Sequence, residues 1–311
     1  MVTIKDIAKR ANVSISTTSR ALNNNPRISQ ETRERIQQIA GEMGYQPNYT
    51  AQNLTRGEAN MVGLIFPVTE DTAPANPFHI DLMRGIGAEL QMLSYEMVVA
   101  IASSQKKLLE EVKSMVAQSK IHNFLIFYVS DKDPVTEYLR DNQLNFVVIG
   151  HPVEGSSDRF VDNDNIAAGK GATTALLNNH RVKNPVFIEN LNPWRYEIER
   201  SKGYHEGMIA KGKNSRIWKV IPGESSLSDL LQQAPEVDGL IFSDDLLFVQ
   251  FSAELRDKKL PIACFNNSRL MGMLTKSDEK VDLQPRKLGK HAVDLLFAPD
   301  QHHQYVEFEI K

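Results

Sequence analysis

Short hydroxyl and amide side chains, together with one arginine, recur between residues 14 and 23. Such groups donate and accept hydrogen bonds at base edges in the major groove of DNA, and arginine pairs with guanine through two parallel bonds. On a helix over residues 15–22 they would share one outer face. A solvated helix of a small bundle is the competing interpretation, because generic helix-turn-helix patterns are loose. The polar candidates on this face are Ser14, Ser16, Thr17, Arg20 and Asn23.

Three short helices are predicted to hold that face in place. Thr3 begins the first with the pattern of a capping box, and apolar residues follow it at helical spacing. Ser14 can cap the second helix, over residues 15–22, and Ser29 the third, which Gly44 ends in the left-handed conformation. A tight turn between the first two helices gives a helix-turn-helix arrangement.

Charge is unevenly distributed along the 311 residues. The whole chain carries −3, whereas residues 1–60 carry +3 and the remainder −6. A basic head on an acidic body indicates that only the head meets nucleic acid. The apolar fraction of 41% and the length suit a globular protein of two or three domains.

Targeting and redox features are sparse. No signal peptide is recognisable, and no apolar run is long enough for a membrane span, so a cytoplasmic protein without a membrane partner is predicted. The single cysteine, Cys264, excludes an internal disulfide framework and is interpreted as a small buried hydrophobe.

The head is similar to a known family. The segments Val2–Ala8, Ala11–Ser14, Thr17–Asn23 and Gly44–Asn48 resemble the head signature of the LacI/GalR repressors. Thr18 departs from the usual valine there. The resemblance implies that Ile15, Ser16 and Arg20 read bases, with Ile15 and Ser16 setting operator preference.

The next segment resembles the hinge of the same family. The hinge helix folds on DNA and wedges a leucine into the minor groove, a role that falls on Leu54, while Ala51 permits close helix approach. An ordinary linker with Leu54 packed on the core is the alternative. Thr3, Arg27 and Asn48 complete the expected DNA contacts.

Apolar runs alternate with helical patterns from Met61 onward, which predicts parallel sheets covered by helices. The predicted strands are Val62–Phe66, Met97–Ile101, Phe124–Tyr128, Phe146–Ile149, Val186–Ile188, Gly239–Phe242 and Ile262–Phe265. The predicted helices are 79–93, 106–118, 134–142, 166–180, 196–212, 246–258 and 286–298. Polar residues that follow these strands are candidates for ligand binding, although most will be loop residues and helix caps.

The resemblance extends over the body, through Asn76-Pro77-Phe78, Asp164-Asn165 with Gly169, and Arg200 with Gly203-Tyr204. The segments 161–165 and 265–267 are closest to maltose-operon repressors. The resemblance implies a two-lobed α/β body like periplasmic sugar-binding proteins, with three crossovers. The predicted parts are a helix-turn-helix head at 1–46, a hinge at 47–60 and an effector-binding and dimerisation body at 61–311. Its amino lobe would be 61–160 plus 286–299, and its carboxyl lobe 161–285 plus 301–311.

An effector site between the lobes follows from the resemblance. The arginine matching Arg200 binds the effector in the family, and its rigid fork suits vicinal hydroxyls or a carboxylate. Asn266 stands where the family has an acid, which puts the identity of the effector in doubt. Phe78 and Trp194 could stack on a sugar, with a place in the core as the alternative. The expected effector residues are Asn76, Phe78, Asp164, Trp194, Arg200, Asp245 and Asn266.

These patterns predict a DNA-binding transcription regulator, a repressor of a maltose or α-glucoside operon controlled by a sugar. A regulator responsive to purines or another metabolite is the alternative within the family. Two other functions are weighed. An exported sugar-binding protein would have no use for the basic head, and the sequence contains no recognisable catalytic motif of an enzyme. No cofactor or metal is expected. The expected partners are a pseudo-palindromic double-stranded DNA operator, a second copy of the chain and, in addition, a phosphoprotein corepressor.

Overall fold

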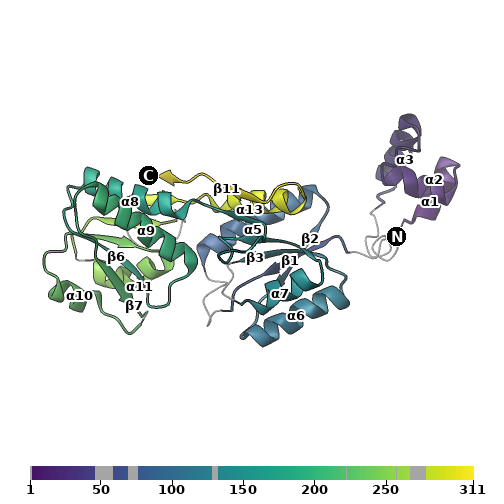
Figure 1. Cartoon of the computed structure of the whole chain (residues 1–311). Coiled ribbons are helices and arrows are strands. Elements are labelled where there is room, and N and C mark those ends of the chain that lie inside the picture. The colour runs from purple at the N-terminus through teal and green to yellow at the C-terminus, as the bar shows by residue number, and fades with distance from the viewer. Residues whose placement is uncertain are drawn as a thin grey trace. The chain divides into compact units, whose positions relative to one another are not determined.

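The computed structural model divides the chain into two compact units, Met1–Gly57 and Glu58–Lys311 (Figure 1). It describes residues 2–45, 59–68, 76–127, 132–221, 223–256, 258–266 and 278–311. The predicted hinge helix, with Asn48, Ala51 and Leu54, therefore lies outside the described residues. No helix in the described ranges is long and apolar enough to cross a membrane.

The first unit contains three helices in its described part: α1 (Ile4–Ala11), α2 (Ile15–Leu22) and α3 (Gln30–Glu42). Asn12 takes the left-handed conformation and turns the chain sharply between α1 and α2. Ser14 and Ser29 cap α2 and α3 by accepting main-chain N–H groups, as the sequence predicts. The small core of this unit is formed by Ile7, Ala11, Ala21, Ile36 and Ala40.

The first lobe of the body is built on a parallel sheet in the order β11-β5-β4-β3-β1-β2. Alternate residues of its strands enter two different apolar clusters, so the sheet is covered on both faces. Helices α5 and α13 pack on one face, and α6 and α7 on the other. The elements are β1 (Met61–Ile65), α5 (Pro77–Met92), β2 (Glu96–Ala100), α6 (Gln105–Ala117), β3 (Asn123–Phe127), α7 (Pro134–Asp141), β4 (Asn145–Ile149), β5 (Phe160–Asp162), α13 (Pro285–Leu296) and β11 (His303–Tyr305).

The second lobe repeats this architecture with the strand order β12-β10-β9-β8-β6-β7. Neighbouring strands in this sheet are parallel, except β10 and β12, which are antiparallel. Helices α8 and α9 share an apolar cluster with α5 and α13, and α10 and α11 cover the opposite face. The elements are α8 (Asn165–Asn179), β6 (Pro185–Asn190), α9 (Arg195–Ala210), β7 (Ile217–Val220), α10 (Leu227–Gln233), β8 (Gly239–Phe242), α11 (Asp245–Leu255), β9 (Ile262–Phe265), β10 (Glu279–Asp282) and β12 (Glu309–Ile310).

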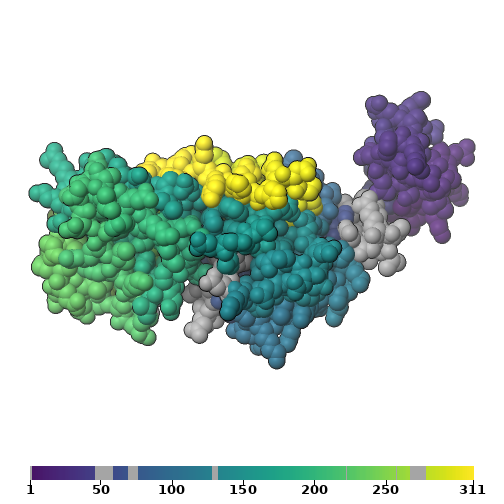
Figure 2. Space-filling view, viewed as in Figure 1, coloured from purple at the N-terminus to yellow at the C-terminus, as the bar shows by residue number. Residues whose placement is uncertain are grey.

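The chain passes between the two sheets three times. The passages lie at 163–164, 283–284 and 306–308, and Figure 2 shows the C-terminal segment running along both lobes. This corrects one predicted boundary: residues 303–305 pair with β5 in the first sheet, whereas the sequence assigned 301–311 to the carboxyl lobe. The reason is that an edge strand is placed by its pairing partner, which the sequence does not show.

The predicted fold class is confirmed: a helical head and a two-lobed α/β body. The apolar strands and amphipathic helices lie within a few residues of their predicted ranges. The strands β5, β7, β10, β11 and β12 and the helix α10 were not predicted. These elements are short, and the missed strands mix polar with apolar residues without a regular pattern, so their pairing decides their structure.

Candidate DNA-binding face and effector site

The exposed face of α2 presents the side chains that the sequence assigns to DNA. Ile15 is 50% exposed, and Ser16, Arg20 and Asn23 are exposed as well. The Arg20 side chain makes no hydrogen bond or ion pair within the described residues, so its donors are available to a ligand. An apolar side chain left in solvent beside a free arginine suits contact with thymine methyl groups and guanine edges.

The N-terminus of α2 is organised by Ser14. Its Oγ accepts from Thr17 N at 3.1 Å and lies 2.8 Å from the hydroxyls of both Ser16 and Thr17. The helix N-terminus and three hydroxyls therefore gather at one point, which suits a phosphate oxygen.

The opposite face of α2 is fixed in the core of the head. Ala21 and Thr18 are fully buried, and Thr18 Oγ1 donates to Ser14 O at 3.1 Å. The hydroxyl at this position is therefore satisfied within the helix, and the departure from valine leaves no buried polar group unpaired.

Two further predicted DNA contacts lie away from α2. Thr3 is exposed before α1, where its N and Oγ1 donate to Asp6 Oδ2 at 2.9 and 2.7 Å. These hydrogen bonds lower the pKa of Asp6, and the bond from the Thr3 hydroxyl has the larger effect. Arg27 is exposed in the loop before α3, and its main-chain N–H donates to Asn25.

In the body, Arg200 of α9 is buried, with only 5% of its surface exposed. Its Nε donates to Asn165 Oδ1 at 3.0 Å, and its Nη1 donates to Ser243 O at 2.6 Å. The guanidinium carbon lies 4.6 Å from the ring centre of Tyr196 and 4.3 Å from that of Phe265. Of its five N–H groups, three make no hydrogen bond within the described part of the chain, which leaves them for a ligand.

Glycines allow the close helix crossing that places Arg200. A Cβ atom on Gly169 of α8 would lie 2.1 Å from the main-chain O of Arg200, and one on Gly203 would lie 2.0 Å from Ile166 O. Both distances are far below any van der Waals contact. The glycines that carry the family resemblance therefore bring α9 against α8 and fix the arginine between them.

Two buried polar side chains near Arg200 are unsatisfied. Both carboxylate oxygens of Asp245 and Oδ1 of Asn266 lack a hydrogen-bond partner of regular geometry within the described residues. Burial, together with the charge of Asp244, raises the pKa of Asp245 to about 7, although a hydrogen bond from the Asn266 amide and the charge of Arg200 act to lower it. Buried polar groups are normally paired, so these atoms indicate a place where ligand hydroxyls or N–H groups bind.

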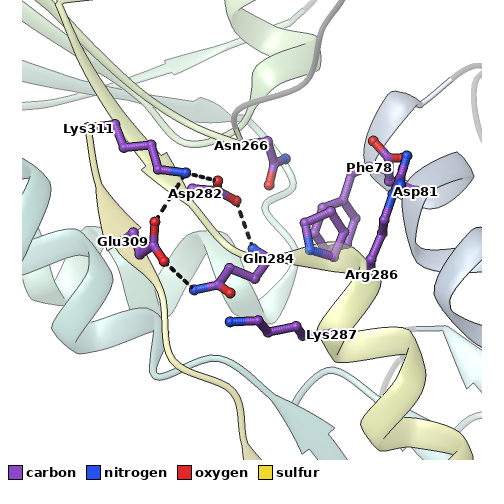
Figure 3. Close-up of a pocket in the computed structure, with 10 residues that line it drawn as sticks. Phe78, Asp81, Asn266, Asp282, Gln284, Arg286, Lys287, Glu309 and Lys311 are labelled. Atoms are coloured by element: carbon purple, nitrogen blue, oxygen red, sulfur yellow. Dashed lines mark hydrogen bonds and ion pairs between the residues drawn. The ribbon is translucent and has the colours of Figure 1, made fainter.

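A pocket of about 420 Å³ opens beside Asn266 and has Phe78 on its far wall (Figure 3). The rest of its wall comes from α5, β10, the start of α13 and the C-terminal residues. There Lys311 Nζ contacts Asp282 Oδ2 at 2.6 Å, and Gln284 Nε2 donates to Glu309 Oε1 at 3.2 Å. Sequence reasoning missed these residues because β10 and β12 were not predicted.

The structure also places the remaining predicted effector residues, Asn76, Asp164 and Trp194. Asn76 caps α5 by accepting from Phe78 N at 2.9 Å, and the exposed Asp164 caps α8 by accepting from Ala167 N at 2.8 Å. Trp194 lies before α9 and lines a small hollow with Phe66 and Phe127 of the first lobe. Of the predicted residues, Phe78 and Asn266 line the pocket, and Arg200 and Asp245 are buried in the second lobe.

Buried carboxyl groups make the stability of the protein depend on pH. Burial, together with the charge of Glu199, raises the pKa of Asp162 to about 7, although hydrogen bonds from Asn163 and Asn165 act to lower it. Burial and Asp244 also raise the pKa of Glu197.

A carboxyl with a raised folded-state pKa favours folding below its ordinary pKa near 4, and this contribution is lost as the pH rises towards 7. The unfolding free energy of the Asp245→Asn variant, relative to the parent, should therefore increase between pH 5 and 8 by on the order of 2 kcal/mol. Urea unfolding followed by the fluorescence of Trp194 and Trp218 measures this difference. A pH-independent difference would show that Asp245 is ionised throughout.

A helix-turn-helix head with an exposed polar second helix, followed by a two-lobed α/β body, is the architecture of a DNA-binding regulator with a ligand-sensing domain. Residues 3–48 match the sequence family described as bacterial regulatory proteins, lacI family. The chain is 28% identical to the transcriptional regulator MalR of Staphylococcus xylosus over 99% of this chain and 94% of that protein. It is 27% identical to the transcriptional regulator CelR of Thermobifida fusca, over 79% of this chain and 74% of that protein. The head of the chain, residues 3–48, therefore matches the lacI family, and the chain as a whole is similar to transcription regulators of that kind.

Solved structures show the same fold. A probable maltose operon repressor from Staphylococcus aureus superposes with a TM-score of 0.75 at 22% identity, covering 82% of this chain and 96% of that one. The lac repressor dimer bound to operator superposes with a TM-score of 0.71 at 16% identity, covering 99% and 97%.

Proposed function

We propose that this regulator represses an operon for the use of maltose or a related α-glucoside, and that the sugar binds between its lobes. The observation that carries the proposal is the cluster at Arg200: free guanidinium donors lie near two buried side chains whose oxygens have no hydrogen-bond partner of regular geometry in the described residues. A pyranose offers vicinal hydroxyls that both accept and donate, which such a cluster can satisfy. The aromatic ring of Phe78 across the pocket supplies an apolar surface for the sugar face.

The choice of sugar rests on the relatives. Three of the curated relatives are MalR regulators, at 28–29% identity. A solved relative with the same fold is described as a complex of CelR with cellobiose. A purine-responsive regulator is the second candidate, because a purine also combines donors, acceptors and an aromatic face, but no feature of this site selects a purine over a sugar.

A homodimer is proposed as the DNA-binding species. Met97, Val99 and Ile101, on or just after edge strand β2, are between 36 and 49% exposed, and Met92 and Leu93 near it are 79 and 45% exposed. Burying these side chains against a second copy removes apolar surface from water. A two-fold dimer carries two copies of α2 and therefore matches a pseudo-palindromic operator.

The proposal includes no catalytic step and no cofactor. We place the protein in the bacterial cytoplasm, because its target is chromosomal DNA. The head and the hinge at 47–60 are proposed as the DNA-binding part. A phosphoprotein corepressor stays a prediction.

One titration tests the proposal. Binding of the full-length protein to its operator is measured by gel shift at fixed salt, with and without maltose, and the mass of the complex is measured by sedimentation. We expect two chains per operator duplex and a change in operator affinity with maltose of at least about fivefold. An unchanged affinity, together with no heat of maltose binding in calorimetry, would contradict the sugar class. Guanine and hypoxanthine are then tested as the alternative ligands.

A further inference from the structure

All three passages between the lobes meet at one side chain, that of Asn163. It lies in the first passage and is 2% exposed. Its Nδ2 donates to Leu283 O of the second passage at 3.1 Å and to Val306 O of the third at 2.8 Å. A primary amide has two N–H groups, so both donors are used. A side-chain carboxylate here would place oxygen against two carbonyl oxygens, and an aliphatic side chain would leave both carbonyls without this donor.

Asn163 is also connected to Arg200 through buried hydrogen bonds. Asn163 N donates to Asp162 Oδ1 at 2.8 Å, and Asn165 Nδ2 donates to Asp162 Oδ2 at 3.1 Å. Asn165 Oδ1 in turn accepts from Arg200 Nε at 3.0 Å. The connection runs through the main-chain N of Asn163 and three side chains, and all four residues are 2–6% exposed, so water does not compete for the bonds.

We propose that Asn163 is a positioning residue that sets the angle between the two lobes, and that the Asp162–Asn165 pair transmits the position of Arg200 to it. Because the bonds from Asn163 join the passages themselves, a small rotation of its amide changes how the lobes are held. The transmission step rests on the proposed function, since it takes Arg200 as the anchor of the effector. The positioning step depends on the contacts of Asn163 alone.

The positioning step is tested without any ligand. Spin labels on Lys106→Cys of α6 and Lys202→Cys of α9, both exposed, report the distance between the lobes, and the buried Cys264 stays unlabelled. Labelled protein is diluted with unlabelled protein so that the distances measured lie within one chain. Asn163→Ala should shift or broaden the distance distribution beyond the repeat error. A distribution equal to that of the parent would overturn the positioning role.

Asn145→Ala is the matched control. Asn145 also donates from its amide to main-chain oxygen, at 3.0 Å from Leu296 O, and it contacts Asn123 and Arg159, but all these partners belong to the first lobe. This variant should lower the melting temperature and leave the distance between the lobes unchanged. If Asn163→Ala does not fold, Asn163→Ser, which retains one hydroxyl donor, is measured in the same way.

The transmission step is tested with maltose as the probe. The ratio of operator affinities with and without maltose is compared between the parent, Asn163→Ala and Asn145→Ala. We expect Asn163→Ala to bring this ratio to within about twofold of one, from the fivefold or more expected of the parent, and Asn145→Ala to keep the parent ratio. A parent-like ratio in Asn163→Ala overturns transmission. If the parent does not bind maltose, the sugar class and the transmission step fail together, and the distance measurement still decides the positioning role.

Discussion

Replacing Arg20 with alanine should weaken operator binding by about 1–3 kcal/mol, a loss of roughly 5- to 150-fold. The physical reason is that Arg20 is exposed on α2 and has no partner within the described residues, so its bidentate donors are free for a guanine edge. Gel-shift titration at fixed salt, against the operator and a scrambled duplex, measures the effect. Binding to the scrambled duplex should fall much less, because phosphate contacts by the rest of the head survive.

Arg10→Ala provides the control for charge. Arg10 belongs to α1 of the same head and is exposed, and it pairs with Glu42 at 3.1 Å. Removing it changes the net charge by the same amount as removing Arg20, but it should reduce operator and scrambled binding about equally. If Arg20→Ala also reduced both equally, α2 would not be the base-reading helix.

Replacing Arg200 with alanine should weaken maltose binding by on the order of 1.5–3 kcal/mol, a loss of roughly 10- to 150-fold in affinity. Removal of the guanidinium leaves ligand hydroxyls without donors, and it also frees Asn165 Oδ1 and Ser243 O. Calorimetry with maltose measures the loss, and circular dichroism of the same sample checks that the variant is folded. Arg200→Lys keeps the charge but not the planar fork, so its affinity should fall as well.

Arg195→Ala is the control for this second substitution. Arg195 lies one turn earlier on α9 and pairs with Glu199 at 3.2 Å. Its removal should change maltose affinity by less than about twofold, because an i,i+4 ion pair within one helix contributes little and the described bond of Arg195 is to Glu199, not to a residue of the site. Maltose binding by Arg200→Ala equal to that of the parent would remove Arg200 from the site. The DNA-binding prediction for Arg20 would then be unaffected.

The head was predictable from the sequence because its determinants are local. Ser14 caps α2 through a residue three positions away, and the apolar residues at helical spacing form its core. The polar face of α2 follows from the same spacing. The fold class of the body was predictable for a similar reason, since strands buried on both faces are continuous apolar runs.

The effector site was predictable only in part. Arg200, Asp245 and Asn266 followed from resemblance, but the sequence does not show that the arginine is buried or that the oxygens of the other two lack partners. Asn76 and Asp164 matched family segments, and in the structure they also cap α5 and α8. The residues of the pocket wall on β10 and β12 carried no periodic signal.

Only the tertiary structure decides which residues far apart in the chain contact each other. Asn163 meets Leu283 and Val306 across separations of 120 and 143 residues. The short edge strand β11 joins the first sheet because its partner β5 lies there. Local spacing determines which face of a helix or strand is apolar, whereas these pairings depend on how whole lobes pack, and no neighbouring residue encodes them.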